Sequence, residues 1–181
     1  LDIKGKKIII DAGPDFRYQM LRSQVKDLRA ILLTHGHKDH IGGLDDVRAF
    51  NWVKQGAVDV YGNEGTREVV YKDFSYAFAA FRYPGVPEIN YHVIDDRPFY
   101  IDDIQVVPIP VLHYKMPVLG FRIGNFAYIT DAKTIPASSM ERLKGVEYLV
   151  INALRKELHM SHFNLEEALT MIARIQPKSA F

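Results

Sequence analysis

The chain reads Ala30-Ile31-Leu32-Leu33-Thr34-His35-Gly36-His37-Lys38-Asp39-His40 in its first quarter. The apolar residues 30–33 predict a short buried strand, and Gly36 predicts a loop directly after it. Three of the seven histidines of the chain lie within the six residues from His35 to His40. Since a loop at a strand end can direct several side chains into one small volume, this stretch predicts a cluster of polar groups there.

The donor atoms of this loop suit a divalent metal ion. Imidazole nitrogens and carboxylate oxygens bind zinc, manganese or iron at neutral pH. His35 and His37 are two residues apart and can bind one ion, which leaves Asp39 and His40 for a second. A single histidine near a strand end is usually a surface or core residue, but four ligand-type residues in six positions are hard to explain in that way. We therefore expect a metal site.

The composition is that of an ordinary globular protein. The 181 residues are 48% hydrophobic and 25% charged, which favours one domain over residues 1–181 with a sizeable core. A net charge of +1 gives no reason to expect nucleic acid or a membrane as a partner. The absence of cysteine excludes disulfides and thiolate ligands and fits the cytoplasm. Because the chain begins with Leu1 rather than Met, we expect a short upstream segment to be missing.

Hydrophobic patterning predicts many strands with helices between them. Strands are expected at 6–11, 30–34, 57–61, 89–94, 97–101, 104–111, 118–123, 126–130 and 148–152, and helices at 16–25, 44–50, 64–81, after Pro136 and from Asn164. Gly124-Asn125 predicts a tight hairpin turn, and Glu167 can complete a capping box with Asn164. An apolar stripe on the last helix is expected in the core: Leu165, Ala168, Leu169, Ile172 and Ile175. The order predicts an α+β fold in which two mixed β-sheets pack face to face and helices flank them.

Four more candidate residues follow predicted strands: His113, Asp131, His159 and His162. Taken singly, an aspartate at a strand end usually caps or turns the chain, and a histidine there is seldom a ligand. A metal needs ligands from more than one loop. Because the loop at 35–40 is present, we expect His113 and Asp131 to be ligands as well.

Together, the strand ending in Asp11, the Thr34–His40 loop, His113 and Thr130-Asp131 resemble the metallo-β-lactamase superfamily of hydrolases. The resemblance implies a four-layer αββα sandwich with a two-metal site along one edge. It also implies the ligands: His35, His37 and His113 for the first ion, Asp39 and His40 for the second, and Asp131 for both. Asp11 would accept a hydrogen bond from a ligand histidine.

Residues 11–17, 42–48 and 161–164 resemble the branch of this superfamily that contains PhnP, a phosphoribosyl cyclic phosphate phosphodiesterase. The branch implies a phosphodiesterase that attacks a small cyclic or nucleotide-like phosphate ester with a hydroxide activated by two metals, manganese or zinc, with iron left open. Asp39 and His162 are the expected catalytic residues, and His162 matches the position of a catalytic acid, with His159 as its competitor. Flavin-linked di-iron relatives have Glu where this chain has His37, which argues against a redox role.

Several alternatives stay open. The same metals could serve a lactonase, a thioesterase or an RNA-processing nuclease, or the chain could be a metal-binding scaffold without activity. Arg17, Tyr114 and Lys115 could contact a phosphate or simply be surface residues. The aromatic residues in 74–83 could form a substrate lid, a homodimer contact or core. The family usually supplies a last histidine from the strand after the final helix, so we expect that ligand beyond Phe181, or a weakly bound second ion.

Overall fold

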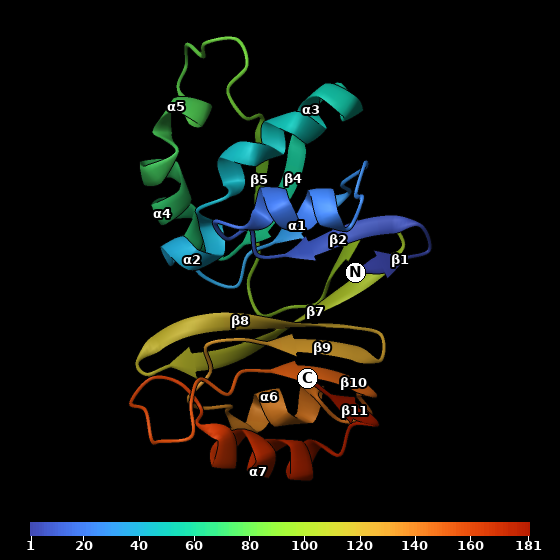
Figure 1. Ribbon diagram of the computed structural model, residues 1–181, viewed down its shortest axis with the longest axis vertical. Helices are drawn as coiled ribbons and strands as arrows, with labels where there is room; N and C mark the ends of the chain where they lie inside the picture. The colour runs from blue at the N-terminus through green and yellow to red at the C-terminus, as the bar shows by residue number, and fades with distance from the viewer. The chain divides into compact units, whose positions relative to one another are not determined.

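The computed structural model describes all residues from Leu1 to Phe181, and the chain divides into two compact units (Figure 1). The N-terminal unit is Leu1–Asp95 and the C-terminal unit is Asp96–Phe181. Each unit contains one sheet, and its helices pack on one face of that sheet. None of the helices has the length and apolar character needed to cross a lipid bilayer.

The sheet of the N-terminal unit has the order β1-β2-β3-β4-β5. Its strands are β1 (Asp2–Ile3), β2 (Lys6–Ile10), β3 (Ala30–Leu32), β4 (Val58–Gly62) and β5 (Ile89–Val93). Strands β2 to β5 are parallel, and only β1 is antiparallel to its neighbour. The carboxyl ends of β2 and β3 therefore meet at one edge of the sheet, and this places Asp11 beside Thr34 and the histidine loop.

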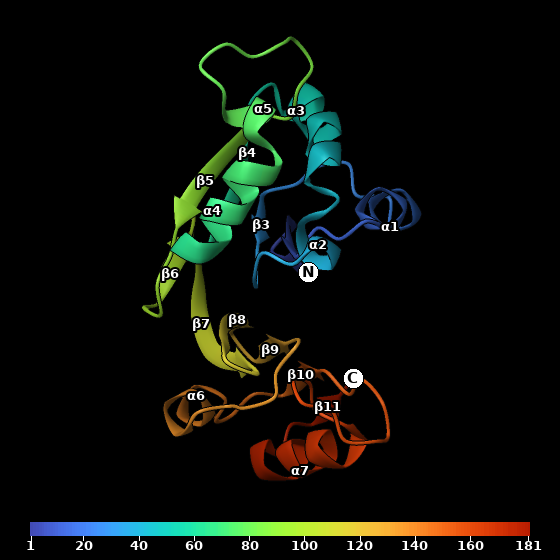
Figure 2. The ribbon, with the colours of Figure 1, turned by 90° about the vertical axis from the view of Figure 1, so that its left-hand side faces the viewer.

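Six helical segments complete this unit: α1 (Phe16–Arg22), α2 (Lys38–Ile41), the 3-10 helix η1 (Leu44–Val47), α3 (Arg48–Lys54), α4 (Glu64–Asp73) and α5 (Ser75–Phe78). Figure 2 shows α4 running alongside β4 and β5. The core lies between the helices and the sheet, where Ile31, Val58 and Val60 of the strands pack against Phe16, Phe50 and Val70 of the helices. Alternation along β4 places Asp59 and Tyr61 on its other face.

The helix expected over 64–81 is interrupted at Phe74, where φ is −114° and ψ is 35°. The ring of Phe74 is buried in the core, and the chain bends to place it there. Phe78 stacks on Tyr71 with ring centroids 3.9 Å apart, whereas Phe81 is 87% exposed. The loop at 79–88 precedes β5, so it lies at the sheet edge opposite the histidine loop. Within this unit, that placement argues against the lid interpretation.

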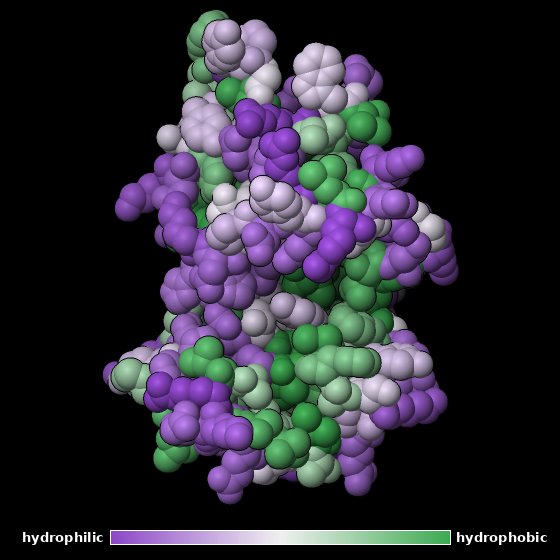
Figure 3. Space-filling view, in the orientation of Figure 1, coloured by the Kyte–Doolittle hydropathy of each residue, from purple (hydrophilic) through white to green (hydrophobic).

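An apolar groove of about 640 Å³ lies between α1 and α3. Phe16, Met20 and Phe50 line its base, and the exposed side chains of Leu21, Trp52 and Val53 line its rim. Figure 3 shows hydrophobic residues among hydrophilic ones on the surface over α1 and α3. The groove is on the helical face of the sheet and includes none of the candidate ligands.

The sheet of the C-terminal unit has the order β11-β10-β9-β8-β7-β6. Its strands are β6 (Phe99–Ile101), β7 (Ile104–His113), β8 (Met116–Ile123), β9 (Phe126–Ile129), β10 (Tyr148–Ile151) and β11 (Ser179–Ala180). Strands β6 to β9 are antiparallel, while β9, β10 and β11 are parallel. Gly124, with a φ of 59°, makes the predicted turn between β8 and β9.

The helices α6 (Ala137–Arg142) and α7 (Leu165–Ile175) cover one face of this sheet. Asn164 and Glu167 form the predicted capping box at the start of α7. The predicted apolar stripe is only partly right, because Leu165 and Leu169 are exposed. The helix instead buries Ala168 and packs Met171, Ile172 and Ile175 against the sheet, which follows the spacing of a single helical face.

Candidate metal centre

The histidine loop forms the first candidate half-site, which we call the N-terminal half-site: His35, His37, Asp39 and His40. The last three residues of the predicted loop, together with Ile41, form the short helix α2, which His37 precedes. The His35 Nε2 and His37 Nδ1 atoms lie 3.0 Å apart. Two nitrogens bound to one zinc ion lie roughly 3.3 Å apart, since each bond is about 2.0–2.1 Å long. His40 Nε2 lies 3.5 Å from Asp39 Oδ2. The donor set and its spacing therefore fit divalent cations.

Asp11 and Thr34 support this half-site from behind. Asp11 Oδ1 accepts a hydrogen bond from the Thr34 amide at 2.8 Å, and Oδ2 accepts one from the Thr34 hydroxyl at 2.8 Å. His40 Nδ1 lies 2.7 Å from Asp11 Oδ2. Because a carboxylate can only accept here, His40 presents its Nε2 atom to a metal. Burial raises the pKa of Asp11, and the hydrogen bonds from His40 and Thr34 act in the opposite direction.

Thr34 is a functional candidate that the sequence reasoning did not identify. It is fully buried, and its hydroxyl also lies 3.0 Å from His35 Nδ1. One hydroxyl thus contacts both Asp11 and His35 and directs His35 Nε2 away from the threonine. Its position directly before the first histidine of the motif is the only signal in the sequence.

Two glycines let the turn after β2 pack directly on α2. A Cβ atom on Gly13 would lie 2.3 Å from the Asp39 carbonyl oxygen, and one on Gly43 would lie 2.2 Å from the Gly13 carbonyl oxygen. The Ala12 amide donates to the His40 carbonyl at 2.8 Å. The close backbone approach fixes Asp11 relative to His40, and any larger residue at position 13 or 43 would separate them.

The second candidate half-site, which we call the C-terminal half-site, consists of His113, Asp131 and His162. His113 ends β7, Asp131 follows β9 and His162 precedes α7. Their donor atoms all lie within 4.8 Å of one another, and His162 Nδ1 is 3.6 Å from Asp131 Oδ1. The fold thus brings together three residues that are far apart in sequence, in an arrangement that also fits a divalent cation.

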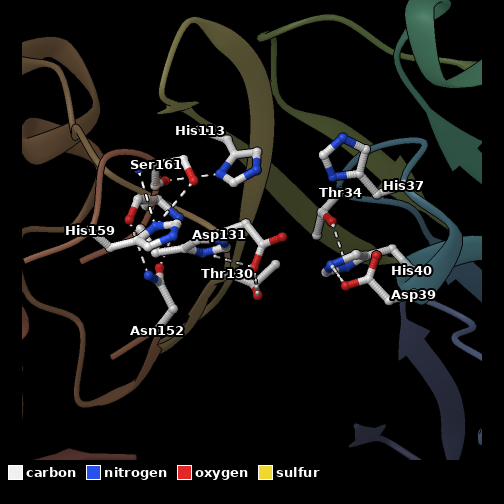
Figure 4. A network of polar contacts seen from close by, with 12 residues as sticks. Thr34, His37, Asp39, His40, His113, Thr130, Asp131, Asn152, His159 and Ser161 are labelled. Atoms are coloured by element: carbon white, nitrogen blue, oxygen red, sulfur yellow. Dashed lines mark hydrogen bonds and ion pairs between the residues drawn. The ribbon is translucent and has the colours of Figure 1, made fainter. Parts of the chain in front are cut away.

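The loop before α7 orients this half-site. His113 Nδ1 donates to the Ser161 carbonyl at 2.9 Å, so that His113 Nε2 is the nitrogen available to a metal (Figure 4). His159 accepts a hydrogen bond from the Ser161 amide at 3.3 Å and does not belong to the metal-binding group. Its ring centroid is 5.1 Å from that of His162. This geometry favours His162 over His159 as the candidate catalytic residue.

The three candidate phosphate contacts are surface groups. Arg17 lies on α1, 3.8 Å from Asp46, and its side chain is largely exposed. Tyr114 and Lys115 form the turn between β7 and β8, next to His113, and the Lys115 ammonium lies 5.4 Å from the centre of the Tyr114 ring. Only the last two are close to a half-site in their own unit.

Residues 6–181 match the family model described as "Beta-lactamase superfamily domain". The chain belongs to the beta-lactamase superfamily. A crystal structure described as a new diphosphatase from the PhnP family superposes with a TM-score of 0.91 and 35% identity over 98% of this chain and 68% of that one. The match confirms the fold class expected from sequence, two mixed sheets with helices, and a hydrolase family.

Two curated relatives are longer proteins. The octanoyltransferase of Porphyromonas gingivalis is 40% identical over 173 residues, 94% of this chain and 35% of that protein. Ribonuclease Z of Nostoc punctiforme is 30% identical over 121 residues, 65% of this chain and 37% of that protein. The chain aligns with only about a third of the length of either relative.

Proposed function

We propose that the protein is a metal-dependent phosphoric diester hydrolase of the PhnP-like branch, acting on a small cyclic or nucleotide-like phosphate ester. The observation that carries the proposal is the C-terminal half-site, where His113, Asp131 and His162 converge from three separate segments. The similarity to the PhnP-family diphosphatase supports the choice of a phosphorus-containing substrate.

The proposed ligands follow the predicted assignment. His35, His37 and His113 would hold one divalent ion, Asp39 and His40 a second, and Asp131 both. Both half-sites contain only nitrogen and oxygen donors, which suits manganese or zinc and admits iron. When bound, such ions supply Lewis acidity and lower the pKa of water. Superfamily membership and the donor sets of the two half-sites support this assignment.

The residues of the chain would do the remaining work. The carboxylate of Asp39 is largely exposed and would orient the attacking water by accepting a hydrogen bond. The water oxygen would form a bond to phosphorus and pass a proton to the Asp39 carboxylate as the bond from phosphorus to the leaving oxygen breaks. His162 would donate a proton to that oxygen, and its Nδ1 atom lies 3.6 Å from Asp131 Oδ1.

The proposal is tested with the purified full-length protein and bis-p-nitrophenyl phosphate, beside a lactone and a thioester. We expect metal-dependent release of p-nitrophenol that a chelator removes and added manganese or zinc restores. Hydrolysis of the lactone or thioester alone would contradict the phosphodiesterase assignment. No turnover of any ester by fully metal-loaded protein would point to a scaffold without activity.

An RNA-processing nuclease is the second candidate, because ribonuclease Z proteins are among the relatives. The net charge of +1 argues against a long RNA substrate, whose binding relies on many cationic contacts. A structured RNA and a dinucleoside diphosphate are tested in parallel. Cleavage of the RNA would favour the nuclease, and cleavage of the dinucleoside diphosphate would favour a diphosphatase.

A further inference from the structure

We propose that Asn152 is a positioning residue for the metal centre, which fixes Asp131 and the His162 loop through the backbone of Ala132. The inference rests on the proposed function. Asn152 follows β10, and its side chain reaches the loop that follows β9. Figure 4 shows Asn152 beside the segment that carries Thr130 and Asp131.

The Asn152 amide binds both polar groups of one residue. Its Oδ1 accepts a hydrogen bond from the Ala132 amide at 2.8 Å, and its Nδ2 donates to the Ala132 carbonyl at 3.0 Å. Ala132 is fully buried, so these backbone groups have no access to water and need partners within the protein. A side chain with one donor and one acceptor at this spacing satisfies both.

This contact holds Asp131 in an unfavourable backbone conformation. The φ of Asp131 is 54°, in the left-handed region that is uncommon for residues other than glycine, although aspartate adopts it more often than most. Such a conformation persists only where the surroundings fix it. Asn152 fixes the next residue on both its amide and its carbonyl side, and so determines where the Asp131 carboxylate lies.

The same carbonyl also holds the second member of the half-site. The Ala132 oxygen accepts a hydrogen bond from the Phe163 amide at 2.8 Å, and Phe163 directly follows His162. The Phe163 ring is buried in the core of the unit. One backbone group therefore connects Asp131, Asn152 and the His162 loop, and loss of the Asn152 amide would loosen two candidate site residues together.

The N-terminal unit contains a matched control for a purely structural role. Asn51 is buried, whereas Asn152 is half-buried, and the Asn51 amide likewise binds both backbone groups of one residue, Glu88. Its Oδ1 accepts from the Glu88 amide at 2.9 Å, and its Nδ2 donates to the Glu88 carbonyl at 2.9 Å. Its Nδ2 also donates to the Gly56 carbonyl at 3.0 Å. These contacts hold the start of β5 and involve no candidate ligand. Asn51→Ala thus removes equivalent hydrogen bonds away from both half-sites.

The test compares zinc affinity and thermal stability of Asn152→Ala and Asn51→Ala in the full-length protein. We measure the Kd for zinc by competition with a chromophoric chelator, and the melting temperature without metal. Both variants should melt at lower temperature, but only Asn152→Ala should bind zinc more weakly, by about 10- to 100-fold. Equal Kd values for the two variants would overturn the inference.

A second variant covers the case in which Asn152→Ala does not fold. Asn152→Asp has the same shape and keeps the acceptor for the Ala132 amide but loses the donor to the Ala132 carbonyl. Its added negative charge would by itself attract a cation, so weaker zinc binding can come only from the altered position of the ligands. Zinc affinity equal to or tighter than that of the wild type would contradict the inference.

The controls separate this inference from the proposed function. If the wild type binds zinc and Asn152→Ala binds it more weakly, the positioning role stands even where phosphodiesters are not hydrolysed. If wild-type activity is confirmed but the zinc affinity of Asn152→Ala is unchanged, only the positioning role fails. A wild-type protein that binds no divalent metal would overturn both.

Discussion

The two half-sites differ in how the chain builds them. The N-terminal half-site is contained in six consecutive residues, and two side chains, those of Asp11 and Thr34, orient its histidines. The C-terminal half-site collects residues 113, 131 and 162, and backbone groups position it: the Ser161 carbonyl holds His113, and Ala132 connects Asp131 to the His162 loop. The N-terminal half-site, built from consecutive residues, needs only side chains that set the orientation of its imidazole rings. The C-terminal half-site also needs backbone contacts that hold its separate segments in place.

The largest expected effect is the loss of a candidate ligand from the N-terminal half-site. His37→Ala should abolish metal-dependent phosphodiester hydrolysis and reduce metal content, because His35 would lose the nitrogen that lies 3.0 Å away. The loss should exceed the about 10- to 100-fold that removal of a residue supporting a ligand costs. Elemental analysis and turnover of bis-p-nitrophenyl phosphate measure it. The control is His92→Ala, whose ring contacts Asp59 in the same unit. Retention of metal and activity in His37→Ala would show that the site is wrongly assigned.

The next prediction distinguishes proton donation from metal binding by His162 in the C-terminal half-site. His162→Ala should lower kcat by about 10²- to 10⁴-fold for an alkyl phosphodiester, whose leaving oxygen needs a proton. The loss should be much smaller for bis-p-nitrophenyl phosphate, since p-nitrophenolate leaves without one. His159→Ala is the matched control and should affect neither substrate comparably. Equal losses for both substrates, with lower metal content, would instead make His162 a ligand.

A smaller effect is expected from substitution of Asp11, which supports the N-terminal half-site. Asp11→Asn replaces the acceptor facing His40 Nδ1 with an amide that can also donate, so the preferred tautomer of His40 is no longer fixed. Metal affinity should fall about 10- to 100-fold. Titration with zinc measures the change, with Asp45→Asn as control, because the Asp45 carboxylate binds Tyr76 at 2.5 Å and no candidate ligand. Unchanged zinc affinity in Asp11→Asn would show that Asp11 does not orient His40 for metal binding.

The smallest effect concerns stability alone. Partial burial would raise the pKa of Asp59, but hydrogen bonds from His92, Arg29 and Asn90, together with the Lys54 charge, lower it from 3.8 to about 2. A depressed pKa stabilises the folded state above pH 4, and this contribution is lost as the pH falls toward 2. Asp59→Asn should therefore reduce the free energy of unfolding by about 1–2 kcal/mol at pH 7, with a difference that shrinks between pH 4 and 2.

Denaturant titrations of wild type and Asp59→Asn across this pH range measure the difference. Because Asp59 contacts no half-site residue in its unit, zinc affinity should stay at the wild-type value. A stability difference that does not depend on pH would contradict the assigned pKa. A change in zinc affinity would show that the network around Asp59 is coupled to the metal centre.

Local signals predicted local structure well. The apolar run before His35 gave β3, Gly124 marked a hairpin turn, and Asn164 with Glu167 gave the capping box of α7. The break at Phe74 and the exposure of Leu169 were missed, because burial against the sheet decides both and periodicity along one segment does not encode it. Local pattern therefore suffices for elements but not for what each element faces.

The same limit applies to the candidate site. The candidate ligands from His35 to His40 are recognisable as a motif, whereas His113 and Asp131 became candidates only because that motif is present. The proposed roles of Thr34 and Asn152 depend on partners more than 15 residues away or on a ring orientation, which a single sequence does not show. Polar residues that hold candidate ligands in place are therefore recognised from the folded structure and not from the sequence alone.

The central proposal is the ligand assignment for two divalent ions, in which Asp131 is the ligand that both ions share. The most direct measurement is the metal stoichiometry of the full-length protein and of Asp131→Ala by elemental analysis, with melting curves to show that both are folded. We predict close to two ions per chain in the wild type and fewer than one in the variant. Wild-type stoichiometry in a folded Asp131→Ala protein would contradict the claim.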